Sequence, residues 1–333
     1  MPIPRDSQRI VIAGASSLLG AELKSLLEES RFAGWDFSLL DEEIAVGTLT
    51  EAAGEPAVIQ PVEEGSFVRA KLVFFTGSAA FTERNLPAAS ESGATVIDLS
   101  GAALSVQEAS VWFAIEGVGQ IAGKNKTLYA VPSAPGLAAG RVLDALGRAG
   151  LSRLALIFFR PVSEAGRAGI EELESQTTQL LSFQSAGEPV FNTQVAFNLL
   201  DRYGSASREN LQSVRARIRS EAGIAVGRNA VQPCIQVLHG PVFYGYTFTA
   251  IAQLDFKSSK NDLFEACRKA GFTLNSDPSS PLGNLNASGD SAIHLALPES
   301  DPAQPGAWWF WGAADNVRVP ASTAIKLAEK LAE

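Results

Sequence analysis

Cysteine and histidine are scarce in this chain, with two of each among 333 residues. So few cysteines exclude a disulfide framework and fit a reducing compartment, which predicts a cytoplasmic protein. Cys234, Cys267, His239 and His294 are scattered, and no pair has the spacing of a metal site. Neither a disulfide-stabilised secreted domain nor a metalloprotein is expected.

Clustered positive charge and long apolar runs are also lacking. The formal net charge is −9, which argues against a nucleic-acid surface because such surfaces need clustered Lys and Arg. The arginines within 208–219 alternate with apolar residues and indicate the solvated side of an amphipathic helix. No window approaches the roughly 18 apolar residues of a membrane span, and residues 1–6 lack the apolar stretch of a signal peptide. We therefore expect neither a nucleic-acid nor a membrane partner.

The first part of the chain alternates predicted strands with predicted helices. Short apolar runs predict strands, and the spacing of leucines predicts a helix. The strands are expected at 10–13, 37–40, 72–75 and 95–99, and the helix at 21–29. This alternation predicts an α/β fold with a doubly wound parallel sheet of Rossmann type, whose ligands bind at the carboxyl ends of the strands.

From residue 137 onward the pattern changes to longer strands separated by helices. Helices are predicted over 137–147, 169–183, 263–270 and 321–332, and strands over 154–159, 231–238 and 243–256. This pattern predicts an α+β domain with a mixed or antiparallel sheet, one face of which is covered by helices. The segment 277–289, rich in Pro, Ser, Gly and Asn, is expected to be an irregular loop.

Gly14 and Gly20 bracket a turn between the first predicted strand and the first predicted helix. The first glycine permits a tight turn, the second lets the helix approach the strand, and the helix N-terminus can receive a pyrophosphate. Asp41 ends the second strand, where an acid would bind the adenosine ribose and favour NAD over NADP. The alternative for Asp41 is a capping acid on a loop. The predicted dinucleotide-binding residues here are Gly14, Ser16, Ser17 (in place of the middle glycine), Leu18, Gly20 and Asp41.

Motifs that occur in order along nearly the whole chain resemble those of the aspartate-semialdehyde dehydrogenase family. They include the Gly14–Gly20 turn, Val96-Ile97-Asp98, Val162–Gly166, Pro241–Gly245 and Ala314-Asp315-Asn316. The resemblance is closest to the Usg-type homologues, which keep the fold and depart from the family at the active site.

The resemblance implies a domain organisation and an assembly. It implies a Rossmann-type NAD(P)-binding domain over 5–132, an α+β dimerisation domain over 133–312, and a C-terminal helix within 313–333 that returns to the first domain. A homodimer is expected on the same grounds. The resemblance also places Asn316 among the cofactor-binding residues.

In active members of that family, a cysteine thiolate attacks the aldehyde, a histidine handles the proton, hydride passes to NADP, and phosphate cleaves the thioester. The resemblance places the cysteine position at Ala134, the histidine position at Tyr246, and the arginine for the substrate carboxylate at His239. A methyl group cannot attack, a phenol with an ordinary pKa of about 10 is a poor base, and imidazole lacks the bidentate grip of guanidinium. An alignment shifted by one residue offers Ser133, whose hydroxyl needs a base to become a nucleophile.

The leading prediction is therefore a family member that does not interconvert the semialdehyde, and that serves as a dimeric nucleotide-binding, sensing or assembly protein. The alternative is an oxidoreductase that acts on an aldehyde or oxo group with NAD or NADP by an altered mechanism in amino-acid biosynthesis.

The remaining cysteines and histidines have structural interpretations. Cys234 is expected to be a small buried strand residue, and Cys267 to lie on the apolar side of a short helix. His239 is expected to be a loop histidine bonded to backbone, and His294 to be structural.

Overall fold

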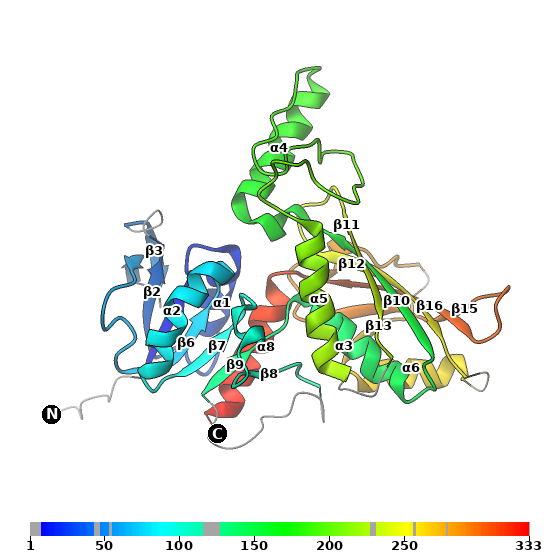
Figure 1. Cartoon of the computed structure of the whole chain (residues 1–333), viewed down its shortest axis with the longest axis horizontal. Helices are drawn as coiled ribbons and strands as arrows, with labels where there is room; N and C mark the ends of the chain where they lie inside the picture. The colour runs from blue at the N-terminus through cyan, green and yellow to red at the C-terminus, as the bar shows by residue number, and fades with distance from the viewer. Residues whose placement is uncertain are drawn as a thin grey trace. The chain divides into compact units, whose positions relative to one another are not determined.

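The chain divides into two compact units. The computed structural model describes residues 8–42, 47–52, 55–115, 127–226, 231–255, 258–277 and 279–332. The first unit comprises Met1–Pro132 with Pro320–Glu333, and the second comprises Ser133–Val319 (Figure 1). The predicted domain start at Arg5 lies outside the described residues. The predicted boundary after residue 312 falls inside a strand, β16 (Ala307–Ala314).

The first unit is built on a parallel sheet with the strand order β5-β2-β1-β6-β7-β9-β8. The elements of this sheet and its helices are β1 (Arg9–Ala13), α1 (Leu18–Glu28), β2 (Asp36–Asp41), β5 (Gln60–Pro61), β6 (Ala70–Phe75), α2 (Ala79–Glu91), β7 (Thr95–Asp98), the 3₁₀ helix η2 (Ala102–Ser105), β8 (Ser110–Val111), β9 (Leu128–Ala130) and α8 (Arg318–Leu331). A separate antiparallel pair joins β3 (Leu49–Ala52) to β4 (Glu55–Val58).

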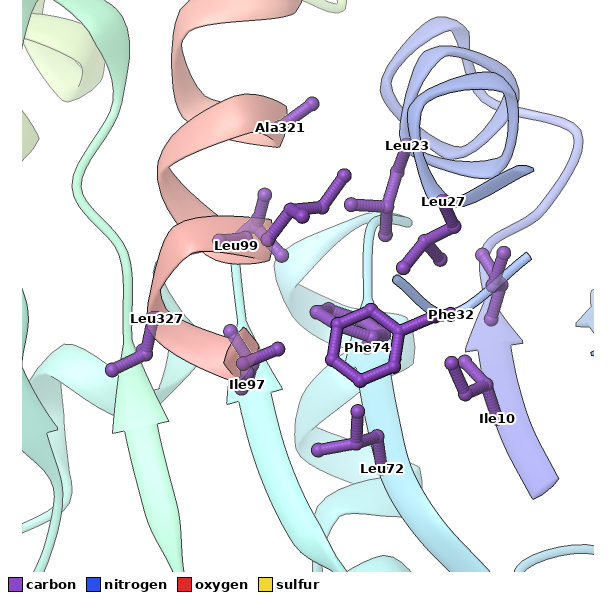
Figure 2. Close-up of a cluster of buried hydrophobic side chains, with 14 of the residues drawn as sticks. Ile10, Leu23, Leu27, Phe32, Leu72, Phe74, Ile97, Leu99, Ala321 and Leu327 are labelled. Atoms are coloured by element: carbon purple, nitrogen blue, oxygen red, sulfur yellow. The ribbon is translucent and has the colours of Figure 1, made fainter. Parts of the chain in front are cut away.

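Helices cover both faces of this sheet. Because successive strand residues point to opposite faces, β1 contributes to two apolar clusters. Ile10 packs in a cluster with Leu23 of α1 and with Ala321 and Leu327 of α8 (Figure 2). Val11 packs on the other side, in the cluster that contains Phe81 and Leu86 of α2. The prediction of a doubly wound parallel sheet is confirmed.

The second unit is built on a mixed sheet with the order β11-β10-β12-β16-β14-β13, and β15 pairs with β16. β10–β11 and β13–β14 are parallel pairs, and the others are antiparallel. Its elements are α3 (Ala134–Gly147), β10 (Arg153–Arg160), the 3₁₀ helix η3 (Val162–Ala165), α4 (Gly166–Leu181), α5 (Leu211–Val226), β11 (Cys234–His239), β12 (Tyr246–Gln253), α6 (Lys260–Lys269), β13 (Phe272–Asn275), α7 (Asn284–Ala287), β14 (Ile293–Ala296), β15 (Glu299–Ser300) and β16. The predicted α+β domain with a mixed sheet is confirmed.

The two faces of this second sheet differ. α3 packs against α5, α6 and β16, and α5 packs against β11. Leu156, Phe158 and Phe248 are fully buried, whereas Trp309 and Trp311, on the opposite face of the sheet, are 41% and 37% exposed. Helices therefore cover one face, and the other carries large apolar side chains.

Three local predictions were wrong. The segment 277–289 contains the single-turn helix α7, which starts where the Asn286 side chain accepts a hydrogen bond from the Gly283 amide (2.8 Å). Cys234 is exposed, because it points away from the helices at the start of the edge strand β11. His239 lies not in a loop but at the end of that strand.

Candidate functional site

Gly14 and Gly20 shape the turn that joins β1 to α1. Gly14 has a left-handed backbone (φ 95°), and a Cβ atom there would lie 2.1 Å from the nitrogen of Gly77. A Cβ atom at Gly20 would lie 2.4 Å from the carbonyl oxygen of Gly14. A side chain at either position would collide with backbone, so the turn, the helix and the neighbouring strand end require glycine at both.

Ser17 is the N-cap residue of α1. Its Oγ accepts a hydrogen bond from the Gly20 amide (2.9 Å) and donates one to the Thr76 carbonyl (2.9 Å). The serine at the middle-glycine position therefore completes the first turn of the helix. The amides of Leu18 and Leu19 find no acceptor among the residues that the structure describes. These donors lie at the positive end of the helix and can bind an anion.

Asp41 lies at the end of β2, beside the same turn, and is nearly buried (8% exposed). Its Oδ2 accepts a hydrogen bond from the Ser16 amide (2.7 Å), and its Oδ1 accepts one from the Glu42 amide (2.8 Å). The carboxylate therefore positions the turn. Each oxygen retains acceptor capacity, so a role at the ribose stays a prediction.

Asn316, the remaining predicted cofactor residue, belongs to the second unit. Its Oδ1 accepts hydrogen bonds from the Gly245 amide (3.0 Å) and from Ser163 Oγ (3.2 Å). Its Nδ2 donates to Glu164 Oε1 (3.2 Å). The side chain is buried and links three segments of the second unit.

The predicted nucleophile position lies at the start of α3. Ala134 is the first residue of the helix and is 1% exposed. Ser133 is the N-cap, and its hydroxyl donates to Glu221 Oε2 at 2.5 Å. Glu221 is fully buried and also accepts from the Ser133 amide (3.0 Å) and from Arg217 Nε (2.9 Å). Ser133 therefore does have a carboxylate partner, which the sequence did not reveal, but that carboxylate is already paired with an arginine.

His239 is fully buried, and it pairs in register with Arg160 on the neighbouring strand. Its Nε2 lies 3.2 Å from the Val195 carbonyl, and its Nδ1 lies 3.4 Å from the hydroxyl of Tyr203. Burial lowers the pKa of His239 to about 4, and the charge of Arg160 contributes to the shift in the same direction. The histidine is therefore neutral at pH 7 and is held within the core, bonded to backbone as expected.

Arg160 supplies a buried guanidinium at this position (2% exposed). Its two terminal nitrogens donate to Glu209 (2.6 Å) and Tyr203 (3.1 Å). Its Nε has no hydrogen-bond partner in the described part of the chain. Although burial opposes the charged form, the phenol of Tyr203 and other acidic neighbours raise the pKa of Arg160, so the side chain stays protonated. The strand next to His239 thus carries a buried arginine that forms an ion pair with Glu209.

Tyr246, at the predicted base position, is 1% exposed, and its hydroxyl lies 3.4 Å from Glu164 Oε2. Burial, reinforced by the nearby Glu164, raises the pKa of Tyr246 well above 10. Burial also raises the pKa of Glu164, although the charges of Arg160 and Arg217 oppose that shift. Tyr246 is therefore a proton donor and cannot serve as a base at neutral pH.

Sequence reasoning missed the side chains that fill this part of the second unit. They are Arg160, Glu164, Arg217 and Glu221. Glu221 lies next to Ile218 and Ala222 on the inward face of α5, and all three are buried. A charged residue that continues the apolar face of the helix predicted within 208–219 was the available signal. Arg217 and Arg215 are half-buried and paired with Glu221 and Gln236, so only part of the expected solvated side faces water.

The other candidate residues do not form a site. Cys267 is buried in α6, as predicted, and burial raises the pKa of its thiol to about 12. His294 Nε2 lies 2.8 Å from Asp290 Oδ2 on the same segment. Within the described ranges, no three His, Cys, Asp or Glu side chains are arranged to hold a metal ion. Every helix formed by those residues is too short or too polar to cross a bilayer.

Known proteins resemble this chain over nearly its full length. The profile of the semialdehyde dehydrogenase NAD-binding domain matches residues 9–132, and that of the semialdehyde dehydrogenase dimerisation domain matches residues 143–319. The chain is 28% identical to a USG-1 protein homolog from Azotobacter vinelandii over 97% of both chains. It is 25% identical to aspartate-semialdehyde dehydrogenase 2 from Vibrio cholerae, again over 97% of both.

The fold is that of a solved relative. A probable aspartate-semialdehyde dehydrogenase from Pseudomonas aeruginosa has a TM-score of 0.88 at 24% identity, and the likeness covers 98% of this chain and 99% of that one. Both units have their counterparts in one family, in the same order along the chain. The chain therefore belongs to the semialdehyde dehydrogenase family.

Proposed function

We propose that this chain is a dimeric, dinucleotide-binding member of the family that does not oxidise or reduce aspartate semialdehyde. The observation that carries the proposal is the environment of Ala134, where a methyl group replaces the nucleophile and Glu221 covers the start of the helix. Substrate chemistry would require a nucleophile and a base in contact. A sensing or assembly role remains for a protein that keeps the scaffold without them.

The geometry of the first unit supports dinucleotide binding. Gly14 and Gly20 permit the tight turn before α1, and the amides of Leu18 and Leu19 have no acceptor among the described residues. These features fit a pyrophosphate at the helix N-terminus. A bound dinucleotide would supply a nicotinamide that accepts or donates hydride. Asp41, next to the turn, would disfavour a phosphate on the ribose, so we expect NAD to bind more tightly than NADP.

The side chains at the reaction centre support the loss of the family reaction. The Ser133 hydroxyl donates a hydrogen bond to Glu221, which also forms an ion pair with Arg217. The same carboxylate also accepts hydrogen bonds from the Ser133 amide and from Arg217 Nε, so it is held as a structural acceptor at the helix cap. Tyr246 keeps its proton because its pKa is raised. Neither side chain can therefore replace the cysteine or the histidine of the active family.

The face of the second sheet opposite its helices supports a homodimer. Trp309, Ile251 and Ala155 form one row across β16, β12 and β10, and Trp311, Thr249 and Ile157 form the next row, according to the strand registers. The two indole N–H groups donate to Asp301 and to the Leu282 carbonyl, so the rings present apolar surface. A second copy with the same face would bury these rows, in an interface that is apolar at its centre.

Light scattering tests the homodimer. The wild-type chain is expected to have a mass twice the 35.1 kDa of one chain. The double variant Trp309→Glu with Trp311→Glu is expected to be monomeric, because it places two charges on the buried face. Val68→Glu, at an exposed apolar residue of the first unit (55% exposed), is the control and should stay dimeric. A wild-type monomer would contradict this part of the proposal.

Calorimetric titration with NAD and NADP, in separate runs, tests the nucleotide-binding part. Micromolar binding, with NAD tighter, is the expected result. The absence of heat and of thermal stabilisation with both dinucleotides would contradict it. The protein would then be a scaffold kept for its surfaces.

A further inference from the structure

The start of helix α3 is covered by a carboxylate from the same unit. Glu221, on α5, has no exposed surface, and its two oxygens accept hydrogen bonds from the Ser133 amide (3.0 Å) and hydroxyl (2.5 Å). Arg217 Nε donates to Oε1 at 2.9 Å. The negative charge therefore lies beside a cation and at the positive end of a 14-residue helix.

Gly136 makes room for this carboxylate. A Cβ atom at that position would lie 2.0 Å from Glu221 Oε2 and 2.7 Å from its Cδ. The first turn of α3 thus combines an absent side chain, two donors from Ser133 and one guanidinium donor around a single carboxylate. These are the components of a binding site for a small carboxylate, formed by the start of α3 together with Arg217 of α5.

We propose that Glu221 acts as a tethered ligand, which occupies a carboxylate site at the start of α3 and keeps it closed to external carboxylates. A tethered group competes at high effective concentration, so a free carboxylate cannot displace it at ordinary concentrations. The ligand class is defined by what Glu221 itself presents, a short unbranched carboxylate. The inference concerns binding alone and holds whether or not the chain catalyses a reaction.

Truncation of Glu221 provides the test. Glu221→Ala removes a CH₂–COO⁻ group, for which free acetate is the matching fragment. Urea unfolding of Glu221→Ala is measured in sodium acetate and in sodium chloride at equal ionic strength. Above the dissociation constant, each tenfold rise in acetate should raise the folded-to-unfolded ratio of the variant about tenfold relative to chloride.

The wild-type chain and Glu221→Gln are the controls. Glu221→Gln keeps the site filled with an uncharged group of the same size, so acetate should stabilise neither control beyond chloride. Acetate should also surpass formate, which is too short, and isobutyrate, which is branched. Equal stabilisation of the variant by acetate, chloride and isobutyrate would overturn the proposal, because it would show a general salt effect and a purely structural Glu221.

Refolding replaces unfolding if Glu221→Ala does not fold in chloride. Denatured variant is then diluted into graded acetate or chloride, and recovered tertiary structure is followed by tryptophan fluorescence. Recovery that rises with acetate and not with chloride supports a vacated carboxylate site. The absence of any difference between the two salts overturns it.

Discussion

The two units each contain a helix that starts at a serine N-cap, and the two helix starts differ in what covers them. In the first unit, Ser17 caps α1, and the amides of Leu18 and Leu19 have no acceptor among the described residues. In the second, Ser133 caps α3, and Glu221 covers the cap. With the same kind of cap, the start of α1 is therefore available to an external anion, whereas the start of α3 already has the carboxylate of Glu221 beside it.

An N-cap motif alone therefore does not identify a binding site. Ser133 and Glu221 are 88 residues apart in the chain, and no feature of the sequence around Ser133 predicts the contact. Whether a helix N-terminus can bind a ligand depends on which distant side chain the tertiary fold brings to it.

Gly14→Ala should cause the largest loss of stability, because an added side chain distorts the turn that precedes α1. A Cβ atom there overlaps the Gly77 backbone and requires a left-handed conformation, so we expect a loss of about 3 kcal/mol or more in the unfolding free energy. Urea unfolding measures the loss. Gly34→Ala is the matched control, since nothing lies within 4 Å of its Cβ position. Equal stability of the two variants would show that the turn tolerates side chains.

The unfolding free energy should depend on pH through His239, which is buried in the second unit. The pKa of His239 falls from 6.5 to about 4 on folding, so the unfolded chain binds the proton more readily between those values. Stability is therefore full above pH 6.5 and is lost as pH falls toward 4, by about 3 kcal/mol. Urea unfolding of wild type and His239→Gln from pH 7 to pH 4 measures this loss, which the variant should lack. Parallel curves for the two proteins would mean that His239 is not held neutral by the fold.

Leu18→Pro should weaken dinucleotide binding about tenfold, the value expected for one hydrogen bond to a charged group. Leu18 is the first residue of α1, where proline is tolerated, and Ser17 before it has an extended backbone (φ −65°, ψ 158°) that suits proline. The change removes the amide donor. Leu18→Ala loses the same side chain but keeps the amide, and should bind normally in calorimetry. Equal binding by both variants would show that the amide of residue 18 does not bind the phosphate groups.

Tyr246→Phe should have the smallest effect. It removes only the hydroxyl that lies 3.4 Å from Glu164 Oε2, so the unfolding free energy should change by less than about 1 kcal/mol. Dinucleotide binding should be unchanged in calorimetry. A variant that lost a catalytic activity present in the wild type would instead assign the tyrosine a chemical role.

The sequence predicted the scaffold well where local signals are strong. Apolar runs located β1, β2, β6 and β7, and the predicted strand at 10–13 differs from β1 (Arg9–Ala13) by one residue. Gly14 and Gly20 were identifiable because steric exclusion leaves only glycine at such positions. The capping role of Ser17 was not predicted, since it depends on contacts with Gly20 and Thr76.

The side chains that surround Ala134, His239 and Tyr246 in the second unit were less predictable. The resemblance led us to expect departures from the family at Ala134, His239 and Tyr246, but it did not indicate which side chains surround these positions. Arg160 lies across the strand pair from His239, which only the register of β10 and β11 reveals. Cys234 was wrongly expected to be buried because burial of a strand residue depends on which face it occupies, and an isolated run does not specify that face.

We propose that the first unit keeps its nucleotide turn while the second has lost the reaction of the family. The most direct test is the rate of NADH or NADPH formation from purified protein with aspartate semialdehyde, phosphate and saturating NAD or NADP. We expect no rate above the protein-free blank with either dinucleotide. A steady rate that Ser133→Ala abolishes would contradict it, and would make Ser133 with Glu221 the reacting pair.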